Sequence, residues 1–257
     1  TLNRMLDNVD AALTQRARSD LRMRQFITDA SHELRTPLAS ILGYAELTRQ
    51  ESQLLPPMTE YALDRIEAES RRMSALVSDL LLLSRLDEGQ DLQIEDFDMC
   101  ELVADAVNDA IVAAPEHDFR ADLPEQPIWV HGDRARLQQV VVNLLANVRI
   151  HTPPGTTVTT SLANRTSGGR PVVALDVADD GPGIPETIMP NLFGRFVRAD
   201  KARSREMGSS GLGLAIVASV IEAHGGKVTA ESRPGRTVFT VLLPGARAVD
   251  ETRSGRP

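Results

Sequence analysis

Residues 26–38 read FITDASHELRTPL and place polar, reactive side chains in the middle of an amphipathic helix. Apolar residues recur three or four positions apart, and residues 1–36 contain neither Gly nor Pro. A nearly continuous helix is therefore predicted from the start of the chain to about residue 50. His32 lies two positions from both Ala30 and Leu34, on the opposite side of the helix from the apolar stripe. The imidazole is expected to face solvent.

The side chains around His32 suit phosphoryl chemistry. An imidazole is a nucleophile near neutral pH, and the adjacent carboxylate of Glu33 can fix its tautomer and accept the ring proton. Thr36 lies one helical turn further on, where its hydroxyl could orient a water towards a phosphorylated imidazole. Pro37 removes a backbone hydrogen bond and is expected to kink the helix. Taken alone, the stretch fits a surface His–Glu pair beside a kink equally well.

A second amphipathic run indicates a helical hairpin. Seven apolar or small residues alternate in steps of three and four: Leu63, Ile66, Ser70, Met73, Val77, Leu80 and Ser84. Pro56 and Pro57 are expected in the connection between the two helices. Because a two-helix hairpin with one apolar stripe buries too little surface alone, pairing with a second copy into a four-helix bundle is expected. The sequence thus predicts a homodimer.

After Gly89 the pattern changes to that of an α+β domain. Strands are predicted at 129–130, 157–162, 172–177, 227–232 and 237–243, and helices at 133–151 and 211–224. Residues 246–257 are rich in Arg, Gly, Ser and Asp, which predicts a disordered tail.

Two glycine-containing segments could contact a ligand. Asp179 ends an apolar strand and is followed by Gly181 and Gly183, whose backbones allow close approach of a flat ligand while the carboxylate accepts a hydrogen bond from an exocyclic amine. Asp179 would then read adenine. The segment 208–217, GSSGLGLAIV, is a polar loop entering an apolar helix, and the free N–H groups at such a helix start suit a polyphosphate. The alternatives are an ordinary Asp-Gly turn and a glycine-rich linker before a core helix.

Two further groups of residues complete the candidate site. Asn143 and Asn147 share one face of an apolar helix, where a neutral amide oxygen can ligate magnesium while phosphates supply the charge. Hydrogen-bonded core Asn residues are the alternative. Cations at Arg195 and Arg198, with two Phe residues beside them, could neutralise a transferring phosphoryl group under a lid. A solvated basic loop is the alternative there.

Composition excludes several classes of partner. The net charge of -8 over 257 residues argues against a nucleic-acid-binding surface, which needs clustered Lys and Arg. Cys100 is the only cysteine, so neither an internal disulfide nor a Cys-based zinc site is possible. The longest apolar stretches fall far short of the roughly 20 residues that span a bilayer. Any membrane anchor is expected upstream of Thr1.

In order and spacing, these motifs resemble those of the sensor histidine kinases of bacterial two-component systems. Residues 31–38 resemble the phospho-acceptor H box, and residues 143–147 the N box. Residues 179–183 and 211–213 resemble the first and second glycine boxes, and residues 192–196 the F box. The match covers nearly the whole chain. More weakly, residues 1–22 resemble the end of a HAMP signalling helix.

The resemblance implies a multidomain chain, with a helical-hairpin four-helix-bundle dimerisation domain at 23–89, a linker at 90–96 and a Bergerat-type ATP-binding α/β sandwich at 97–245. It implies a protein-histidine kinase that uses ATP and Mg²⁺ to phosphorylate His32 and then an aspartate on a response-regulator receiver domain. The chain would be the cytoplasmic portion of a plasma-membrane protein.

The resemblance also assigns roles to single residues. Glu33 is the base, Thr36 a phosphatase residue, Asn147 a magnesium ligand and Asn143 its neighbour. Asp179 reads adenine beside Gly181 and Gly183, while Arg195, Arg198, Gly211, Leu212 and Gly213 contact the nucleotide.

Three positions depart from the family pattern, and two other functions compete with the kinase. Ile150 replaces the usual basic residue before His151, with Arg149 one position earlier. Ser209 replaces a Gly, and residues 234–239 are one residue short of the usual third glycine box. A nucleotide-binding dimeric scaffold with little kinase activity, and an ATPase of related fold, are therefore the alternatives.

Overall fold

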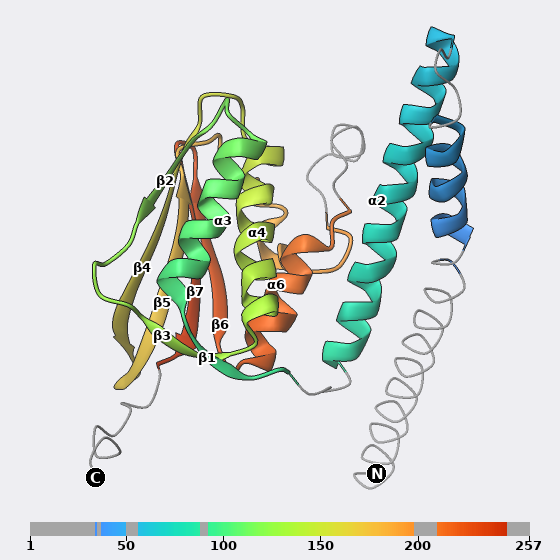
Figure 1. Cartoon of the computed structure of the whole chain (residues 1–257). Helices are drawn as coiled ribbons and strands as arrows, with labels where there is room; N and C mark the ends of the chain where they lie inside the picture. Colours follow the sequence, from blue (N-terminus) through green and yellow to red (C-terminus); the bar gives the residue numbers. More distant parts are fainter. Residues whose placement is uncertain (1–33, 35–36, 50–55, 88–91, 198–209, 246–257) are drawn as a thin grey trace, which may run out of the picture. The chain divides into compact units, whose positions relative to one another are not determined.

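The computed structural model describes residues 34, 37–49, 56–87, 92–197 and 210–245 (Figure 1). The chain divides into two compact units, Thr1–Glu88 and Gly89–Pro257. The predicted HAMP-end helix, the tail at 246–257 and the site residues His32, Glu33, Thr36 and Arg198 lie outside the described residues. No helix in the described part is long and apolar enough to cross a membrane.

The first unit contains the predicted helical hairpin. A helix covers residues 37–49, and helix α2 covers Pro57–Asp87. Arg49 pairs with Asp64 at 2.5 Å, while Arg71 pairs with Glu46 at 3.3 Å. The second pair lies further from the turn than the first on both helices, which is the arrangement of antiparallel helices.

The turn between the helices differs slightly from the prediction. Pro57 is the first residue of α2 rather than part of the connection. A proline is tolerated there because the first N–H of a helix has no intrahelical acceptor.

The apolar stripe of the hairpin splits into a buried and an exposed edge. Leu38, Val77 and Leu81 form a buried cluster between the helices. Ile66 and Met73, which continue the predicted stripe, are 44% and 41% exposed. The helix at 37–49 shows the same division, with Ala45 buried and three apolar side chains exposed: Ile41, Tyr44 and Leu47. The described part of the hairpin therefore exposes apolar side chains on both of its helices.

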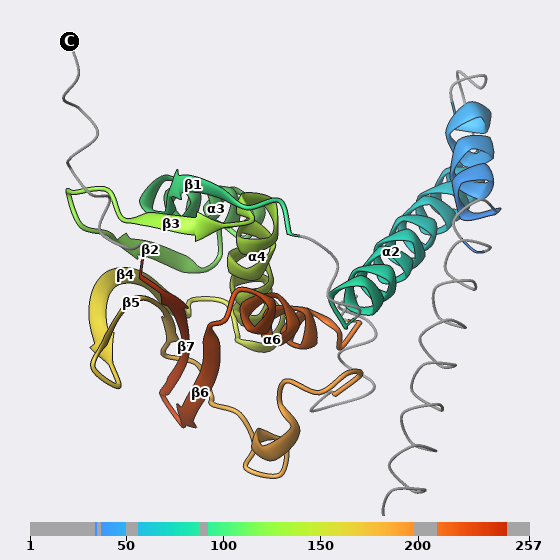
Figure 2. The ribbon, with the colours of Figure 1, turned by 90° about the horizontal axis from the view of Figure 1, so that it is seen from below.

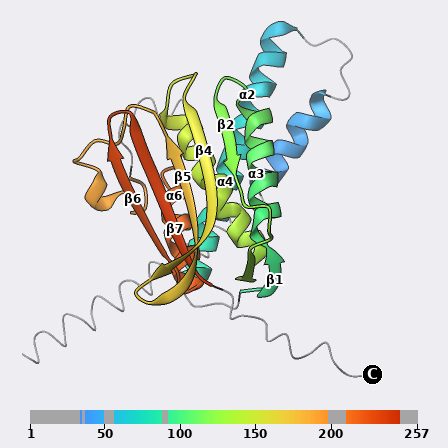
Figure 3. The same cartoon turned by 90° about the vertical axis from the view of Figure 1, so that its left-hand side faces the viewer.

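The second unit is an α/β sandwich built on a five-stranded sheet. Its strands are β2 (Asp118–Asp122), β4 (Thr157–Ser167), β5 (Arg170–Asp179), β6 (Lys227–Arg233) and β7 (Arg236–Pro244). Figure 3 shows their order, β2-β4-β5-β7-β6. Strand β2 pairs in parallel with β4, and the other neighbours are antiparallel.

Three helices cover one face of this sheet, as seen in Figure 2. They are α3 (Met99–Ala113), α4 (Arg134–His151) and α6 (Gly213–Ala223). Large apolar side chains from α4, α6 and β7 are fully buried between the layers, among them Leu144, Ile216 and Phe239. A two-stranded sheet of β1 (Glu95–Asp98) and β3 (Trp129–Gly132) and a short 3-10 helix, η1 (Met189–Asn191), complete the unit. The predicted fold class, a helical hairpin plus an α/β sandwich, is confirmed.

Most predicted elements of the sandwich are present, and three were missed. The predicted strands and helices of residues 129–243 correspond to β3, α4, β4, β5, α6, β6 and β7, with longer strands than expected. The sequence interpretation placed nothing specific at β1, α3 or β2. Helix α3 buries Leu102, Val103, Ala106 and Val107, so its omission left one-third of the helical layer unassigned.

Candidate functional site

A small cavity opens where helix α4 ends beside the loop that follows strand β5. Its lining comes from α4 and the residue after it, from that loop, and from β7: Asn147, Val148, His151, Thr152, Asp179, Pro182, Gly183, Ile184, Thr237 and Phe239. Three of the predicted site residues, Asn147, Asp179 and Gly183, therefore line one cavity although they come from two separate motifs.

Asp179 ends strand β5 and is only 7% exposed. Burial raises the pKa of its carboxyl group above the usual value, and the neighbouring Asp180 acts in the same direction. The N–H of Gly181 donates to Asp179 Oδ1 at 3.0 Å and partly opposes that shift. A carboxylate has a second oxygen that can accept a hydrogen bond from a ligand.

The loop after Asp179 requires glycine at two positions. A Cβ at Gly181 would lie 2.7 Å from both Asp179 Oδ1 and Thr152 Cγ2. Gly183 has a φ of +87°, and a Cβ there would lie 2.9 Å from the backbone carbon of Arg233. Asp179 and Thr152 therefore leave no room for a side chain at Gly181, and the β6–β7 hairpin leaves none at Gly183.

The β6–β7 hairpin also holds this loop by hydrogen bonds. The Gly235 N–H donates to the Gly181 carbonyl at 2.9 Å, and the Ile184 N–H donates to Ser232 Oγ at 2.8 Å. Ser232 Oγ lies 2.9 Å from Thr237 Oγ1, and Thr237 lines the cavity. The loop is thus fixed from the side opposite α4.

The two Asn residues of α4 face different neighbours. Asn147 lines the cavity, whereas Asn143 Nδ2 donates to the Gly213 carbonyl at 3.3 Å. Gly213 is the first residue of α6, and the N-cap residue Leu212 makes no side-chain cap. The first N–H groups of α6 therefore lack a side-chain acceptor from the cap, which suits a bound anion.

The second glycine segment and the aromatic segment lie against each other. Gly211 has a φ of +70°, and a Cβ there would lie 3.1 Å from Phe196 Cα. The Phe196 N–H donates to the Gly211 carbonyl at 2.8 Å. The Leu212 side chain is fully buried, and its N–H donates to Ser210 Oγ at 3.2 Å.

The aromatic segment is also tied to the sheet. The Phe193 ring packs edge-on against Phe239, with ring centroids 6.5 Å apart. Because Phe239 lines the cavity, this contact links the segment to it. Arg195 is exposed and is not among the residues that line the cavity.

Sequence reasoning missed several residues of the cavity. His151, Thr152, Thr237 and Phe239 line it, and none was proposed as a site residue. Partial desolvation lowers the pKa of His151 below its usual value, although its side chain remains exposed at the rim. A usable signal existed for His151 and Thr152, because His151 ends the Asn-bearing helix and Thr152 directly follows it.

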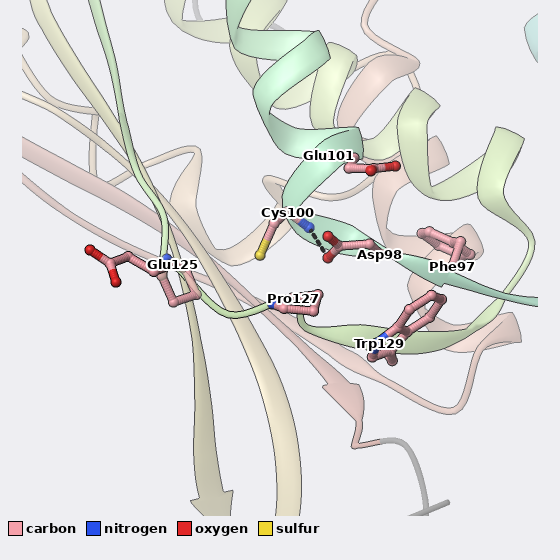
Figure 4. Close-up of a pocket in the computed structure, with 8 residues that line it drawn as sticks. Phe97, Asp98, Cys100, Glu101, Glu125, Pro127 and Trp129 are labelled. Atoms are coloured by element: carbon pink, nitrogen blue, oxygen red, sulfur yellow. Dashed lines mark hydrogen bonds between the residues drawn. The ribbon is translucent and has the colours of Figure 1, made fainter. Parts of the chain in front are cut away.

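A second, open cleft lies at the start of α3, lined by residues that include Asp98, Cys100, Glu125 and Trp129 (Figure 4). Asp98 Oδ1 accepts hydrogen bonds from the N–H groups of Cys100 at 2.9 Å and Ile128 at 3.1 Å. This carboxylate thus caps α3 and holds the chain before β3, which is a structural role.

Comparison with known proteins assigns both units. The protein-family model described as histidine kinase-, DNA gyrase B-, and HSP90-like ATPase matches residues 132–247. The family model described as His Kinase A (phospho-acceptor) domain matches residues 22–89. The sensor histidine kinase TrcS of Mycobacterium tuberculosis is 64% identical over 245 residues, which are 95% of this chain and 48% of that protein.

Solved structures show the same likeness. The mycobacterial sensor histidine kinase MprB is 33% identical with a TM-score of 0.52, and the match covers 59% of this chain and 98% of that one. Full-length ShkA in complex with AMPPNP is 26% identical with a TM-score of 0.72, and the match covers 87% of this chain and 46% of that one. The chain spans about half the length of TrcS, and with both of its units matched it belongs to the sensor histidine kinase family.

Proposed function

We propose that this chain catalyses ATP-dependent phosphorylation of His32 and then passes the phosphoryl group to an aspartate of a response-regulator receiver domain. Glu33 would accept the imidazole proton, and Thr36 would orient a water towards the phosphorylated imidazole. The γ-phosphate leaves ADP and bonds to a ring nitrogen of His32, so one P–O bond breaks as one P–N bond forms. Positioning and charge neutralisation supply most of the catalysis.

The position of Asp179 supports this proposal most directly. A buried carboxylate facing a cavity loses hydration, and an exocyclic amine restores a hydrogen-bond donor to it. Adenine carries such an amine, whereas guanine and hypoxanthine present a carbonyl at the corresponding ring position. The cavity that Asp179 shares with Gly183 and Asn147 therefore favours an adenine nucleotide.

The phosphates and the magnesium ion of MgATP would be held by residues of α4, the start of α6 and the aromatic segment. The N-terminus of α6 would receive phosphate oxygens through Gly211, Leu212 and Gly213, because its first N–H groups have no side-chain cap. The Asn147 amide oxygen would ligate Mg²⁺ with the phosphates completing the charge balance. Asn143 would hold the start of α6 in place through its bond to Gly213. Arg195 and Arg198 would contact the transferring phosphate.

We also propose that the hairpin dimerises. Six of its exposed apolar side chains are between 41% and 72% exposed: Ile41, Tyr44, Leu47, Tyr61, Ile66 and Met73. A second copy that packs against such side chains in a four-helix bundle would bury apolar surface, which offsets the entropy of association. The whole protein would be anchored in the plasma membrane by a segment upstream of this chain, with the residues described here in the cytoplasm.

Labelling of the protein with γ-labelled ATP and magnesium tests the kinase. The wild type should acquire an acid-labile, base-stable label, and His32→Gln should acquire none. His131→Gln is the matched control, because His131 is an exposed histidine on β3 whose ring pairs with Asp96 at 2.8 Å; it should label normally. Nucleotide binding without label in the wild type would contradict the proposal and favour a scaffold. Phosphate release without any labelled protein would favour an ATPase.

A further inference from the structure

We propose that Thr152 and His117 are positioning residues of the adenine cavity. The Thr152 methyl group supports the loop that follows Asp179, and His117 holds the Thr152 side chain in place. This inference rests on the proposed function, because it assigns the cavity to adenine.

Thr152 lies between helix α4 and the loop that carries Asp179. It is the C-cap residue of α4, and its side chain lines the cavity. A Cβ on Gly181 would lie 2.7 Å from Thr152 Cγ2, so the methyl group is in direct contact with the Gly181 backbone. The N–H of Gly181 is the group that donates to Asp179 Oδ1. A shift of the Thr152 methyl group would therefore move the backbone that orients the carboxylate.

The Thr152 hydroxyl makes two hydrogen bonds. Its oxygen donates to the Val148 carbonyl at 2.8 Å and lies 3.1 Å from His117 Nε2. A carbonyl can only accept, so the single hydroxyl proton is used there and His117 Nε2 must be the protonated donor. With its hydroxyl fixed in two directions, the β-branched Thr152 keeps one χ1 rotamer and its methyl group stays against Gly181.

His117 is itself placed rigidly. Its side chain is 2% exposed, and its ring packs against Phe119 with centroids 5.9 Å apart. The other ring nitrogen, Nδ1, lies 3.7 Å from Glu116 Oε1 and has no hydrogen-bond partner among the described residues. A buried polar atom left in this way is costly, which is consistent with a histidine retained for the hydrogen bond at its other nitrogen.

The segment around His117 is fastened to the turn that follows Thr152. The Gly155 N–H donates to the Glu116 carbonyl at 2.7 Å, and the Asp118 N–H donates to the Thr156 carbonyl at 3.0 Å. These bonds keep the imidazole opposite the Thr152 hydroxyl. The connection between α3 and β2, which contains no predicted site residue, thereby acts on the Asp179 loop through one side chain.

Binding of ADP and of inosine diphosphate by the intact chain tests the inference. The two ligands share their phosphates and ribose, but hypoxanthine lacks the exocyclic amine, so the ratio of their dissociation constants reports the orientation of Asp179. Thr152→Ser keeps the hydroxyl and removes the methyl group that contacts Gly181. This variant should reduce the preference for ADP by roughly tenfold, the value of a hydrogen bond to a charged group. Calorimetric titration of each ligand measures the ratio.

Three further variants separate positioning from general stability. Thr240→Ser removes a methyl group from another half-buried threonine, whose hydroxyl donates to Asp176 Oδ1 at 2.7 Å, and should leave the ratio unchanged. His117→Leu should lower the preference for ADP, and His117→Gln, whose amide can still donate to Thr152, should restore most of it. Unfolding in urea, run in parallel, establishes that each variant is folded.

The outcomes distinguish the two proposals. A wild type that binds both nucleotides equally would overturn adenine reading by Asp179, and this inference with it. A wild type that prefers ADP, with Thr152→Ser and His117→Leu preserving the full preference, would overturn the inference alone. If these variants weaken both nucleotides by the same factor, the two residues have only a structural role and the inference is also wrong.

Discussion

Replacement of Gly183 by Ala separates two reasons for a glycine in the loop after Asp179. Gly183 has a φ of +87°, which an L residue adopts only with strain, and an added Cβ would lie 2.9, 3.0 and 3.1 Å from backbone atoms of Arg233 and Pro234. Gly155 has an almost identical φ of +88° but no atom within 4 Å of an added Cβ. The pair therefore shares the conformational cost and differs only in the close contact.

The expected magnitudes follow from this comparison. The left-handed conformation costs about 1–2 kcal/mol in either variant, and the gain of about 0.4–1 kcal/mol from a less flexible unfolded chain is also common to both. In Gly183→Ala the methyl group meets main-chain atoms of the β6–β7 hairpin, which cannot rotate away. Overpacking of this kind adds about 1–3 kcal/mol. Gly183→Ala should thus lose about 1–3 kcal/mol more unfolding free energy than Gly155→Ala.

Urea unfolding of both variants measures the difference, and ADP titration shows its effect on binding. If the loop moves to relieve the contact, Gly183→Ala should bind ADP at least roughly tenfold more weakly, because about 1.4 kcal/mol corresponds to a factor of ten. Gly155→Ala should bind ADP as the wild type does. Equal unfolding free energies in the two variants would refute the argument that the hairpin approaches Gly183 closely.

Substitutions at three other carboxylates are tested by urea unfolding. Asp98→Ala should lose about 2–4 kcal/mol, because it removes the cap of α3 and leaves the Ile128 N–H unpaired; Asp98→Asn should lose clearly less. Asp179→Asn should stabilise the fold at neutral pH, because burial raises the pKa of Asp179 and disfavours its charged form. It should also abolish the preference for ADP over inosine diphosphate. Asp79 in α2 has its pKa raised to about 6 by desolvation, so the charged carboxylate destabilises the folded state above that pH. After allowance for partial exposure, Asp79→Asn should gain about 1–2 kcal/mol above pH 6. This gain should shrink as the pH falls from 6 and vanish below about 4, and a pH-independent gain would contradict the assignment.

Local patterns in the sequence predicted those helices and strands that have a clear apolar pattern of their own. Helix α4 begins after Asp133, whose side chain accepts the Arg136 N–H at 3.1 Å, and its apolar run made the helix predictable. Strands β5 and β7 contain apolar segments bounded by glycine or proline. The bounds of these elements were accordingly predicted to within a few residues. Helix α3 has an equally regular apolar pattern, with Leu102, Val103, Ala106 and Val107 buried, so the sequence carried a signal for this helix as well.

Contacts between distant segments were beyond such patterns. His117 and Thr152 are 35 positions apart, and the contact of Gly183 with Arg233 joins segments 50 positions apart. Neither Thr152 nor Ser232 carries a recognisable motif, because each acts through the geometry of a neighbour. The nucleotide motifs predict which residues contact the ligand. The residues that orient them became visible only in the folded chain.

The shortened glycine segment at 234–239 shows how such contacts change the interpretation of a sequence departure. Arg233 pairs with Arg236, so only Pro234 and Gly235 form the turn between β6 and β7. The turn is short enough for the Gly235 N–H to reach the Gly181 carbonyl, while Ser232 accepts the Ile184 N–H. Both ends of the Asp179 loop are therefore fixed by the hairpin before any ligand arrives. A loop ordered in advance pays less conformational entropy on binding, so we expect the shortened segment to support nucleotide affinity rather than reduce it.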